Sequence, residues 1–416
     1  MRKTVSLKTI ILAAGLLPQA CFNLAKDDKS KAKSEAELAG DESSSASEAS
    51  CGENPYLGKS LPVNPFYANR VIENSIPLVK GTELEGPMTK LASMSTAVWI
   101  DKTDSIAKID PAIENAKLTT SQTGKKSQLT IVVYNLPVRD CAANASNGEL
   151  SSEQMDHYKH NFIDVIAGKL EQAKEQSFSI IMEVDSLPNL VSNMGIETCQ
   201  TAAPLYKEGI AYAIKKFQLP NVSIYLDTAH AGWLGWKGNQ KKMAQIFKDV
   251  LDMAGGVDTI RGFASNVSNY TPLERIGADR SEPYYSWNDA LGELDFVSQL
   301  KDELAQVGIT GKGFLIDTSR NGVNKPREDW GHWCNVKGAG LGQEPTIAPN
   351  TNGKASCVDA YLWVKPPGES DGTTDQSSPR YDAMCGHGKI DAPEAGEWFH
   401  EHLIDMIKAK SSQDSN

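Results

Sequence analysis

The chain has 416 residues, with 42 lysines and arginines against 53 aspartates and glutamates, which gives a formal net charge of −11 at pH 7. An acidic protein lacks the basic surface that binds nucleic-acid phosphates, and a hydrophobic share of 40% is too high for general disorder. The length allows one barrel-sized domain or two smaller ones. We therefore expect a globular protein that does not bind nucleic acid.

Residues 1–20 have the pattern of a signal peptide. Basic residues at positions 2, 3 and 8 surround the start of a short apolar run at 10–17, and Pro18, Gln19 and Ala20 lead into Cys21. The run is too short to span a bilayer, so we expect cleavage and secretion. A cysteine directly after a small residue is also typical of a lipoprotein, in which a lipid on Cys21 would tether the chain to a membrane at the cell surface. Both alternatives stay open.

Residues 21–50 are predicted to form a flexible tether. Positions 22–50 contain seven Ser, six Ala, four Lys and seven Asp or Glu. Such a segment cannot bury enough apolar surface to offset the entropy lost on ordering. We expect one catalytic domain over residues 51–410, followed by a disordered tail at 411–416.

From residue 54 onward, β-type apolar runs alternate with amphipathic helical stretches. The strands are expected at 97–100, 129–136, 178–184, 222–227, 261–267, 313–317 and 360–365. The helices are expected at 154–174, 202–217, 239–253, 288–307 and 394–409. Strands separated by helices imply parallel strands joined by crossovers, so the sequence predicts the α/β class and a barrel-like domain.

Polar and aromatic residues follow the carboxyl end of every predicted strand, where a parallel barrel places its active site. A single Asp after a strand is more often a helix cap or turn residue, but the recurrence after seven strands favours a catalytic face. These residues, in chain order, are Trp99, Asp101, Arg139, Asp140, Cys141, Asp185, Asp227, His230, Trp233, Trp236, Asn266, Asn269, Tyr270, Asp317, Arg320, Lys365, Glu369 and Asp371.

The chemistry of this face is rich in carboxylates and tryptophans. The sequence has no histidine pair at metal-ligand spacing, no glycine-rich phosphate loop and no GxSxG motif, so no metal or organic cofactor is implied. Carboxylates with aromatic platforms fit glycoside hydrolysis, in which one acid protonates the glycosidic oxygen and a second group assists water. Trp233 and Trp236 lie in the glycine-rich stretch AHAGWLGWKG, which favours a loop.

Seven motifs in chain order resemble glycoside hydrolase family six, over about residues 54–407. They are RDCAANASNGEL (139–150), MEVDSLPNLVSN (182–193), NVSIYLDTAHAGWLGW (221–236), RGFASNVSNY (261–270), IDTSRNG (316–322), HWCNVKGAGLG (332–342) and LWVKPPGESDGTTD (362–375). That family comprises cellobiohydrolases and endoglucanases that cleave β-1,4-glucan with inversion. The resemblance implies a distorted, seven-stranded parallel barrel similar to the TIM barrel.

The resemblance also implies catalytic roles. Asp185 matches the family's general acid, and Asp140 matches the aspartate thought to hold the acid's proton and stabilise the transition state. Asp371 matches the residue often proposed as the base, with a water chain through Ser146 as the alternative. Tyr134 matches the tyrosine proposed to distort the sugar ring.

Substrate contacts are implied in the same way. Four tryptophans match sugar-stacking positions, namely Trp99, Trp233, Trp236 and Trp333. Five residues match hydrogen-bonding positions, namely Asp101, His230, Asn269, Lys365 and Glu369. Trp363 matches no platform, and we expect it to be buried in a strand.

Seven cysteines indicate an oxidising compartment. The resemblance implies the disulfides Cys141–Cys199 and Cys334–Cys385, and Ser370 stands where many relatives have a cysteine. Cys51 and Cys357 remain and could form a third disulfide.

Family members differ in two loops, which together roof the cleft in exo-acting enzymes. Asp140 and Asp185 are 45 positions apart, and Cys334 and Asp371 are 37 apart with the segment 338–356 between them. Because both spacings are long, we expect a cellobiohydrolase that releases cellobiose from the non-reducing ends of cellulose chains. Nothing in the sequence suggests more than a monomer. An endoglucanase with mobile loops is one alternative. A non-catalytic glucan-binding surface protein is another, which the intact Asp140, Asp185 and Asp371 disfavour.

Overall fold

The computed structural model describes residues 51–275, 288–325, 327, 331–388 and 391–413. The chain divides into two units, Met1–Glu48 and Ala49–Asn416, and all described residues belong to the second. The predicted signal peptide, Cys21 and the tether lie outside the described residues. None of the described helices is long and apolar enough to cross a membrane.

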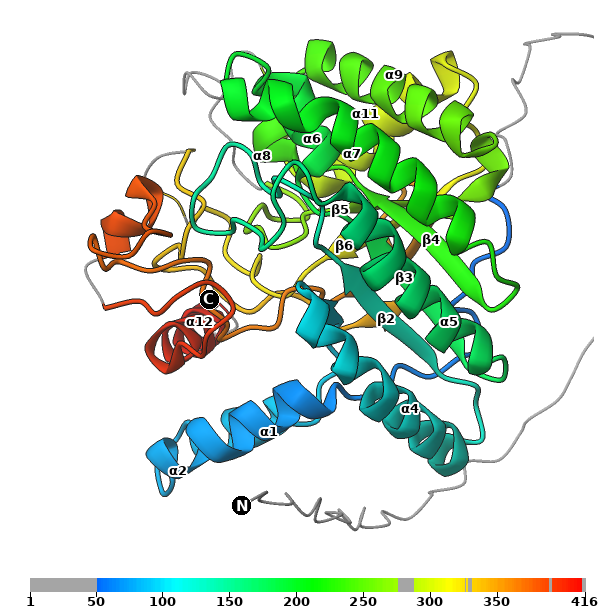
Figure 1. The fold of residues 1–416 in the computed structure, drawn as a ribbon. Coiled ribbons are helices and arrows are strands. Elements are labelled where there is room, and N and C mark those ends of the chain that lie inside the picture. Colours follow the sequence, from blue (N-terminus) through cyan, green and yellow to red (C-terminus); the bar gives the residue numbers. More distant parts are fainter. Residues whose placement is uncertain (1–50, 276–287, 326, 328–330, 389–390, 414–416) are drawn as a thin grey trace, which may run out of the picture. The chain divides into compact units, whose positions relative to one another are not determined.

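The described strands form one sheet in the order β1-β2-β3-β4-β5-β6-β8-β7 (Figure 1). Strands β1 to β6 and β8 pair in parallel and correspond to the seven predicted strands. The sequence did not indicate β7, which is two residues long and antiparallel to β8. The strand bounds are β1 Val98–Ile100, β2 Gln128–Val133, β3 Ser177–Met182, β4 Val222–Asp227, β5 Gly262–Ser265, β6 Gly313–Asp317, β7 Thr346–Ile347 and β8 Val358–Leu362.

The sheet curls until β1 approaches β8. The Ala97 amide donates a hydrogen bond of 3.0 Å to the Trp363 carbonyl, and Trp99 Nε1 donates one of 2.8 Å to the Val364 carbonyl. The interior is filled by a cluster of buried side chains that includes Tyr56, Val132, Ile181, Tyr225, Leu315 and Ala360. The predicted distorted, TIM-like barrel is therefore present, with an eighth strand added at its edge.

Helices cover the outside of the barrel, where α4, α5, α7, α9 and α11 lie along the strands (Figure 1). All five predicted helical stretches contain helix, and 154–174 includes a π-helical segment, His157–Ile163, before α5. Because both faces of the sheet are covered, every residue of β2 and β3 is buried. The helix bounds are α1 Pro65–Asn74, α2 Ile76–Val79, α3 Glu85–Leu91, α4 Ile109–Thr123, α5 Asp164–Gln172, α6 Ser186–Ser192, α7 Glu197–Lys216, α8 Ala231–Leu234, α9 Lys237–Ala254, α11 Glu293–Gln306 and α12 His400–Gln413.

Helices α1 to α4, α6 and α8 were not predicted. The last of these corrects the expectation of a loop, because α8 carries Trp233 within the stretch AHAGWLGWKG. The start of α1 shows the local signal that was available, because Asn64 caps it by accepting a hydrogen bond of 3.0 Å from the Phe66 amide and Pro65 occupies the first turn. At the other end of the chain, α12 extends to Gln413, beyond the predicted helix and into the segment expected to be a tail.

Candidate active site

The carboxyl ends of the strands surround a cavity of about 1120 Å³. Thirteen of the fourteen predicted catalytic and substrate-binding residues line it, namely Trp99, Asp101, Tyr134, Asp140, Ser146, Asp185, His230, Trp233, Asn269, Trp333, Lys365, Glu369 and Asp371. Trp236 is half-buried at the amino end of α9 and does not line this cavity. Trp363 is 2% exposed and belongs to the core, as expected.

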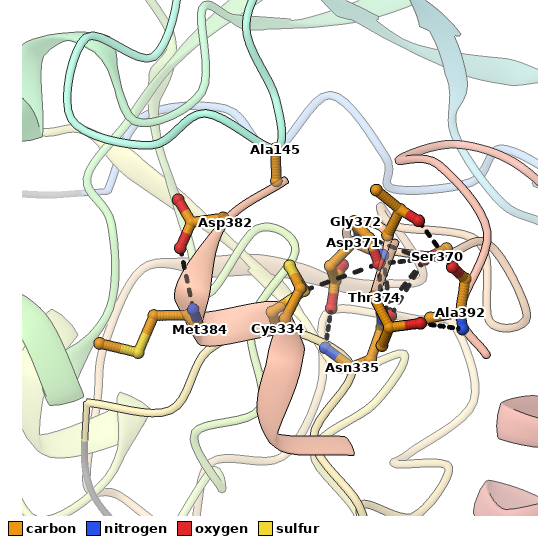
Figure 2. Close-up of a disulfide and its surroundings, with 12 residues drawn as sticks. Ala145, Cys334, Asn335, Ser370, Asp371, Gly372, Thr374, Asp382, Met384 and Ala392 are labelled. Atoms are coloured by element: carbon orange, nitrogen blue, oxygen red, sulfur yellow. Dashed lines mark hydrogen bonds between the residues drawn. A yellow bond between two sulfur atoms is a disulfide. The ribbon is translucent and has the colours of Figure 1, made fainter. Parts of the chain in front are cut away.

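Three disulfides link the described part of the chain, in the pairs Cys51–Cys357, Cys141–Cys199 and Cys334–Cys385. The third lies beside the segment that carries Asp371 (Figure 2). A β-carbon at Gly372 would lie 2.6 Å from Cys385 Sγ, so only glycine fits at this close approach. The disulfide therefore fixes the backbone next to a candidate catalytic carboxylate.

Asp185 follows β3 with a backbone φ of 63°, and its amide donates a hydrogen bond of 2.9 Å to Asp227 Oδ2. Its carboxyl is half-buried, faces the cavity and makes no hydrogen bond within the described part of the chain. Burial and the negative charges of Asp227, Asp140 and Asp371 hold the pKa of Asp185 well above its usual value. Asp185 is thus suited to carry a proton into the cavity.

Asp140 lies opposite, on the loop that follows β2, and also has a positive φ of 55°. Its Oδ2 accepts a hydrogen bond from Ser146 Oγ, and its Oδ1 accepts one of 3.4 Å from Asn189 Nδ2. Burial raises the pKa of Asp140, although the Ser146 hydroxyl and the Arg139 charge oppose this effect. Asn189 lies on α6, and its contact with Asp140 was not predicted.

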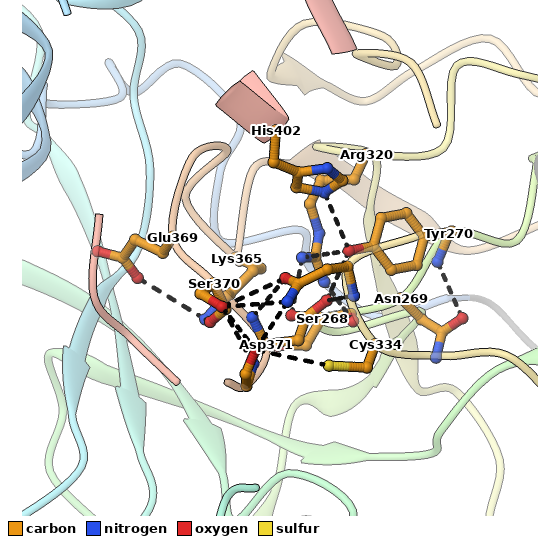
Figure 3. A network of polar contacts seen from close by, with 12 residues as sticks. Ser268, Asn269, Tyr270, Arg320, Cys334, Lys365, Glu369, Ser370, Asp371 and His402 are labelled. Carbon is orange, nitrogen blue, oxygen red and sulfur yellow. Dashed lines mark hydrogen bonds and ion pairs between the residues drawn. The ribbon is translucent and has the colours of Figure 1, made fainter. Parts of the chain in front are cut away.

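Asp371 has a different environment, shown in Figure 3. Its Oδ1 accepts a hydrogen bond of 2.8 Å from Arg320 Nη1, and its Oδ2 accepts bonds of 2.5 Å from the Tyr270 hydroxyl and 2.9 Å from the Asn335 amide. Burial alone would raise the pKa of Asp371, but the charges of Arg320 and Lys365 outweigh burial and lower it. Asp371 therefore stays ionised with both oxygens occupied.

An aromatic and charged group forms one end of the cavity. The Trp99 and Tyr134 rings meet edge to face with centroids 5.7 Å apart, and Lys365 Nζ lies 5.6 Å from the Trp99 ring. Glu369 lies 3.9 Å from Lys365 and 3.3 Å from Arg70. A flat indole face surrounded by charged hydrogen-bonding groups suits a sugar ring, which stacks through its C–H face and forms hydrogen bonds through the hydroxyls at its edge. The sequence did not indicate Arg70, which comes from α1.

His230, Trp233, Asn269 and Trp333 line the cavity farther along the chain. Trp233 Nε1 donates a hydrogen bond of 2.8 Å to Ser192 Oγ, which fixes the ring. Burial, together with the charge of Arg327, lowers the pKa of His230 well below its usual value, so the imidazole is neutral. Among the described residues, no three His, Cys, Asp or Glu side chains are grouped so as to hold a metal ion.

The model of the family described as glycosyl hydrolases family 6 matches residues 56–410. The chain belongs to glycosyl hydrolase family 6. This result confirms the resemblance found in the sequence motifs, and it makes the protein a glycoside hydrolase.

Three relatives of this family 6 chain are informative. "Exoglucanase 3" of Agaricus bisporus is 38% identical over 358 residues, which cover 85% of this chain and 78% of that protein. "Putative endoglucanase type B" of Fusarium oxysporum is 37% identical over 359 residues, covering 85% and 76%. The solved structure of the CcCel6A catalytic domain complexed with p-nitrophenyl β-D-cellotrioside is 38% identical with a TM-score of 0.80, and the match covers 86% of this chain and 98% of that one.

Two segments of the family 6 domain meet at the cavity. The Asn144 amide donates a hydrogen bond of 3.1 Å to Asp382 Oδ2, and Arg380 Nη2 donates one of 2.7 Å to the Ala145 carbonyl. Figure 2 shows the loop with Ala145 reaching toward the segment with Asp382. The loop comes from the end of β2 and its partner follows β8, and residues of both line the cavity.

The sequence interpretation of the second covering loop was wrong. No residue of segment 338–356 lines the cavity, because this segment runs along the edge of the sheet and forms β7. The Gln343 carbonyl in this segment accepts hydrogen bonds of 2.7 Å from Thr318 Oγ1 and 2.8 Å from Trp363 Nε1, which hold it there. The segment that meets the loop of Asp140 instead lies within 372–388 and follows Asp371.

Proposed function

We propose that this protein is a cellobiohydrolase that hydrolyses the β-1,4-glucosidic bonds of cellulose with inversion and releases cellobiose from the non-reducing chain end. Relatives named exoglucanase and a related structure complexed with a cellotrioside support this substrate class. The cavity has the composition that a glucan chain requires, since tryptophans and charged hydrogen-bonding groups both line it.

In the proposed reaction, Asp185 gives its proton to the glycosidic oxygen as the bond to the anomeric carbon breaks. A water molecule attacks the opposite face of the sugar, and its proton passes toward Asp140. The elevated pKa of Asp185 supports the acid role, because the group must be protonated when substrate binds. The hydrogen bond from Ser146 Oγ to Asp140 supports a path for the water's proton along these two side chains.

Asp371 fits an electrostatic role better than the role of base. A base needs a free lone pair directed at the water, whereas both oxygens of Asp371 already accept hydrogen bonds from Arg320, Tyr270 and Asn335. Its lowered pKa also makes it a weak proton acceptor. We propose that its fixed negative charge stabilises the positive charge that develops on the sugar ring.

Trp99, Trp233 and Trp333 are the proposed stacking platforms, and Tyr134 is proposed to press on the ring at the cleavage point. Tyr134 is 6% exposed and is held between the Trp99 ring and the Arg139 guanidinium, whose carbon lies 4.2 Å from the ring centre. Such a rigid aromatic group can distort a bound sugar toward the transition state. Asp101, His230, Asn269, Lys365 and Glu369 are proposed to bind sugar hydroxyls.

The contact between the loop with Ala145 and the segment with Arg380 carries the exo assignment. Where this contact covers the cleft, a glucan chain can enter only by its own end. The test is to resolve the soluble products from amorphous cellulose by length while following the viscosity of a soluble cellulose derivative. We expect nearly pure cellobiose with slow viscosity loss. A ladder of oligomers with fast viscosity loss would establish the endoglucanase alternative, and no product would establish the glucan-binding alternative.

The endoglucanase alternative requires the roof to open, and one relative is named an endoglucanase. Replacing Arg380 by Ala removes the bond to the Ala145 carbonyl without touching a carboxylate of the reaction. We expect the soluble cellulose derivative to lose viscosity faster per bond cleaved with this variant than with the wild type. Lys207→Ala, on the outer surface, serves as the control and should leave this ratio unchanged.

We also propose that the protein is secreted as a monomer. The predicted signal peptide and the three disulfides support an oxidising compartment. The mass of the mature amino terminus distinguishes simple cleavage from a lipid on Cys21, which would add the mass of its acyl chains.

A further inference from the structure

Glu183 is a buried carboxylate two positions before Asp185. It is 1% exposed, and it does not line the cavity. Its backbone has a φ of 47°, a left-handed conformation that costs a non-glycine residue about 1 kcal/mol or more. A strained and buried acid that cannot reach the substrate requires another explanation.

The Glu183 side chain reaches across to the neighbouring strand's loop. Its Oε2 accepts hydrogen bonds from two consecutive backbone amides, those of Asn135 at 3.1 Å and Leu136 at 3.2 Å. Its Oε1 accepts one of 2.7 Å from the Tyr158 hydroxyl. The Glu183 amide also donates a hydrogen bond of 2.8 Å to the Val133 carbonyl. One residue thus binds the end of β2 through both its backbone and its side chain.

The Asn135 and Leu136 amides lie at the start of the loop that carries Asp140. Beyond Leu136 the backbone passes through positive φ at Val138 and again at Asp140. Such conformations persist only where the surroundings fix them. The Tyr206 hydroxyl holds the first turn by donating a hydrogen bond of 2.6 Å to the Val138 carbonyl. Glu183 is the part of this support that lies on the same short segment as Asp185.

We propose that Glu183 is a positioning residue, which fixes the loop of Asp140 against the strand end of Asp185 and so sets the separation of the two carboxyls. The proposal rests on the proposed function, since it assigns these two groups to the reaction. The geometry requires Glu183 to act through its reach and its acceptor oxygens, and not through its charge.

Two substitutions separate reach from charge. Glu183→Asp keeps the carboxyl but withdraws it by one methylene, so the Asn135 and Leu136 amides lose their acceptor. Glu183→Gln keeps the length, since its oxygen can accept both amides while its nitrogen donates to the Tyr158 hydroxyl. Burial raises the pKa of Glu183 to about 7, so at pH 5 the native group is itself neutral.

The test measures kcat and KM on cello-oligosaccharides at pH 5. We expect Glu183→Asp to lose about 100-fold in kcat with KM within about threefold, because misplacing a reacting group by about 1 Å has this effect while the sugar platforms stay in place. We expect Glu183→Gln to retain kcat within about fivefold. Wild-type kcat in Glu183→Asp, or equal loss in both variants, would overturn the proposal.

Glu293 supplies a matched control. It is also a fully buried carboxylate that accepts a backbone amide, that of Ala231 at 2.8 Å, together with the Ser265 hydroxyl. It supports α8, which carries Trp233, and not the loop of Asp140. We expect Glu293→Asp to raise KM more than it lowers kcat. An equal loss of kcat in both Asp variants would indicate general loosening and would refute a specific role for Glu183.

Amide hydrogen exchange measures the hydrogen bonds from the Asn135 and Leu136 amides to Glu183, here called the clamp, independently of catalysis. We expect the Asn135 and Leu136 amides to exchange at least about tenfold faster in Glu183→Asp than in the wild type. If the wild type hydrolyses no β-1,4-glucan but this difference is found, the proposed function fails while the clamp stands. If the wild type is active and the exchange rates are equal, the positioning proposal fails by itself.

Discussion

Asp359 at the amino end of the barrel and Asp185 at its carboxyl end are two carboxyl groups with different surroundings. At the amino end, Arg261 lies 2.7 Å from Asp359 and also donates a hydrogen bond to the Cys51 carbonyl, while the Tyr225 hydroxyl donates to the second Asp359 oxygen. At the carboxyl end, Asp185 has no ion-pair partner among the described residues, and burial together with the charges of Asp227, Asp140 and Asp371 raises its pKa. The carboxyl end also holds an ion pair, that of Arg320 with Asp371, so the contrast is between the two carboxyl groups: Asp359 is held by its partner, and Asp185 keeps a proton available for chemistry.

Backbone strain is concentrated at the carboxyl end, although Cys357, just before β8, and Ala348, just after β7, also have positive φ. Seven non-glycine residues just beyond strands at the carboxyl end have positive φ, namely Val138, Asp140, Glu183, Asp185, Ala229, Asn266 and Ser268. Each such conformation costs on the order of 1 kcal/mol, and strain of this kind gathers where side chains must point in directions that regular structure does not allow. The comparison teaches that most of the strained backbone lies where the candidate catalytic side chains leave the strands.

The largest expected effect comes from Asp185→Asn at the carboxyl end. Removing the general acid should lower kcat on cellulose by about 1000-fold. The melting temperature should stay the same or rise, since a carboxyl repelled by Asp227 and Asp140 is removed. An aryl cellobioside with a good leaving group, which needs little protonation, should recover much of the rate. A variant with wild-type kcat on cellulose would refute the acid assignment.

Asp359→Asn tests the amino end. The side chain of Asp359 is 2% exposed, and breaking its buried pair with Arg261 should cost about 3 kcal/mol of unfolding free energy. The value of kcat should not change, because the pair is remote from the cavity. Denaturant unfolding measures the first quantity. The exposed Asp249, which pairs with Lys207, gives the control, and Asp249→Asn should cost less than about 1 kcal/mol.

The disulfide Cys51–Cys357 closes a loop of 306 residues at the amino end. Replacing both cysteines by serine should lower the unfolding free energy by about 2–4 kcal/mol and leave kcat unchanged. Replacing Cys334 and Cys385 should act differently, since this disulfide lies beside Asp371 and the covering segment. With that second variant we expect a soluble cellulose derivative to lose viscosity faster than with the wild type. A change of kcat in the first variant would show that the two ends are coupled.

The smallest expected effect is a shift in pH dependence. Asp185 must be protonated, so kcat is full below its pKa and is lost as pH rises through it. Asp227→Asn removes a negative charge that raises the pKa of Asp185 and keeps an oxygen to accept its amide. The alkaline limb of the kcat profile should therefore shift to lower pH, by about half to one pH unit. An unchanged limb would mean that burial and the charges of Asp140 and Asp371 set this pKa without Asp227.

The sequence by itself determined the parallel barrel and most of the cavity. Strands such as β2 and β3 are recognisable because both of their faces are buried and most of their residues are apolar or β-branched. Functional residues follow the strand ends, and parallel strands bring all of these ends to one face. Ten of the thirteen predicted residues that line the cavity follow strand ends, whereas Tyr134, Ser146 and Trp333 were implied by the family resemblance alone.

Only the tertiary structure decided which neighbours meet across long sequence separations. The sequence does not show that Arg70 of α1 pairs with Glu369, that segment 338–356 lies at the sheet edge, or that Trp236 is outside the cavity. It also does not show that Glu183 is buried while Asp185, two positions on, faces the cavity. Positive φ at both residues redirects the side chains, and such backbone is fixed by contacts from distant elements, not by local preference.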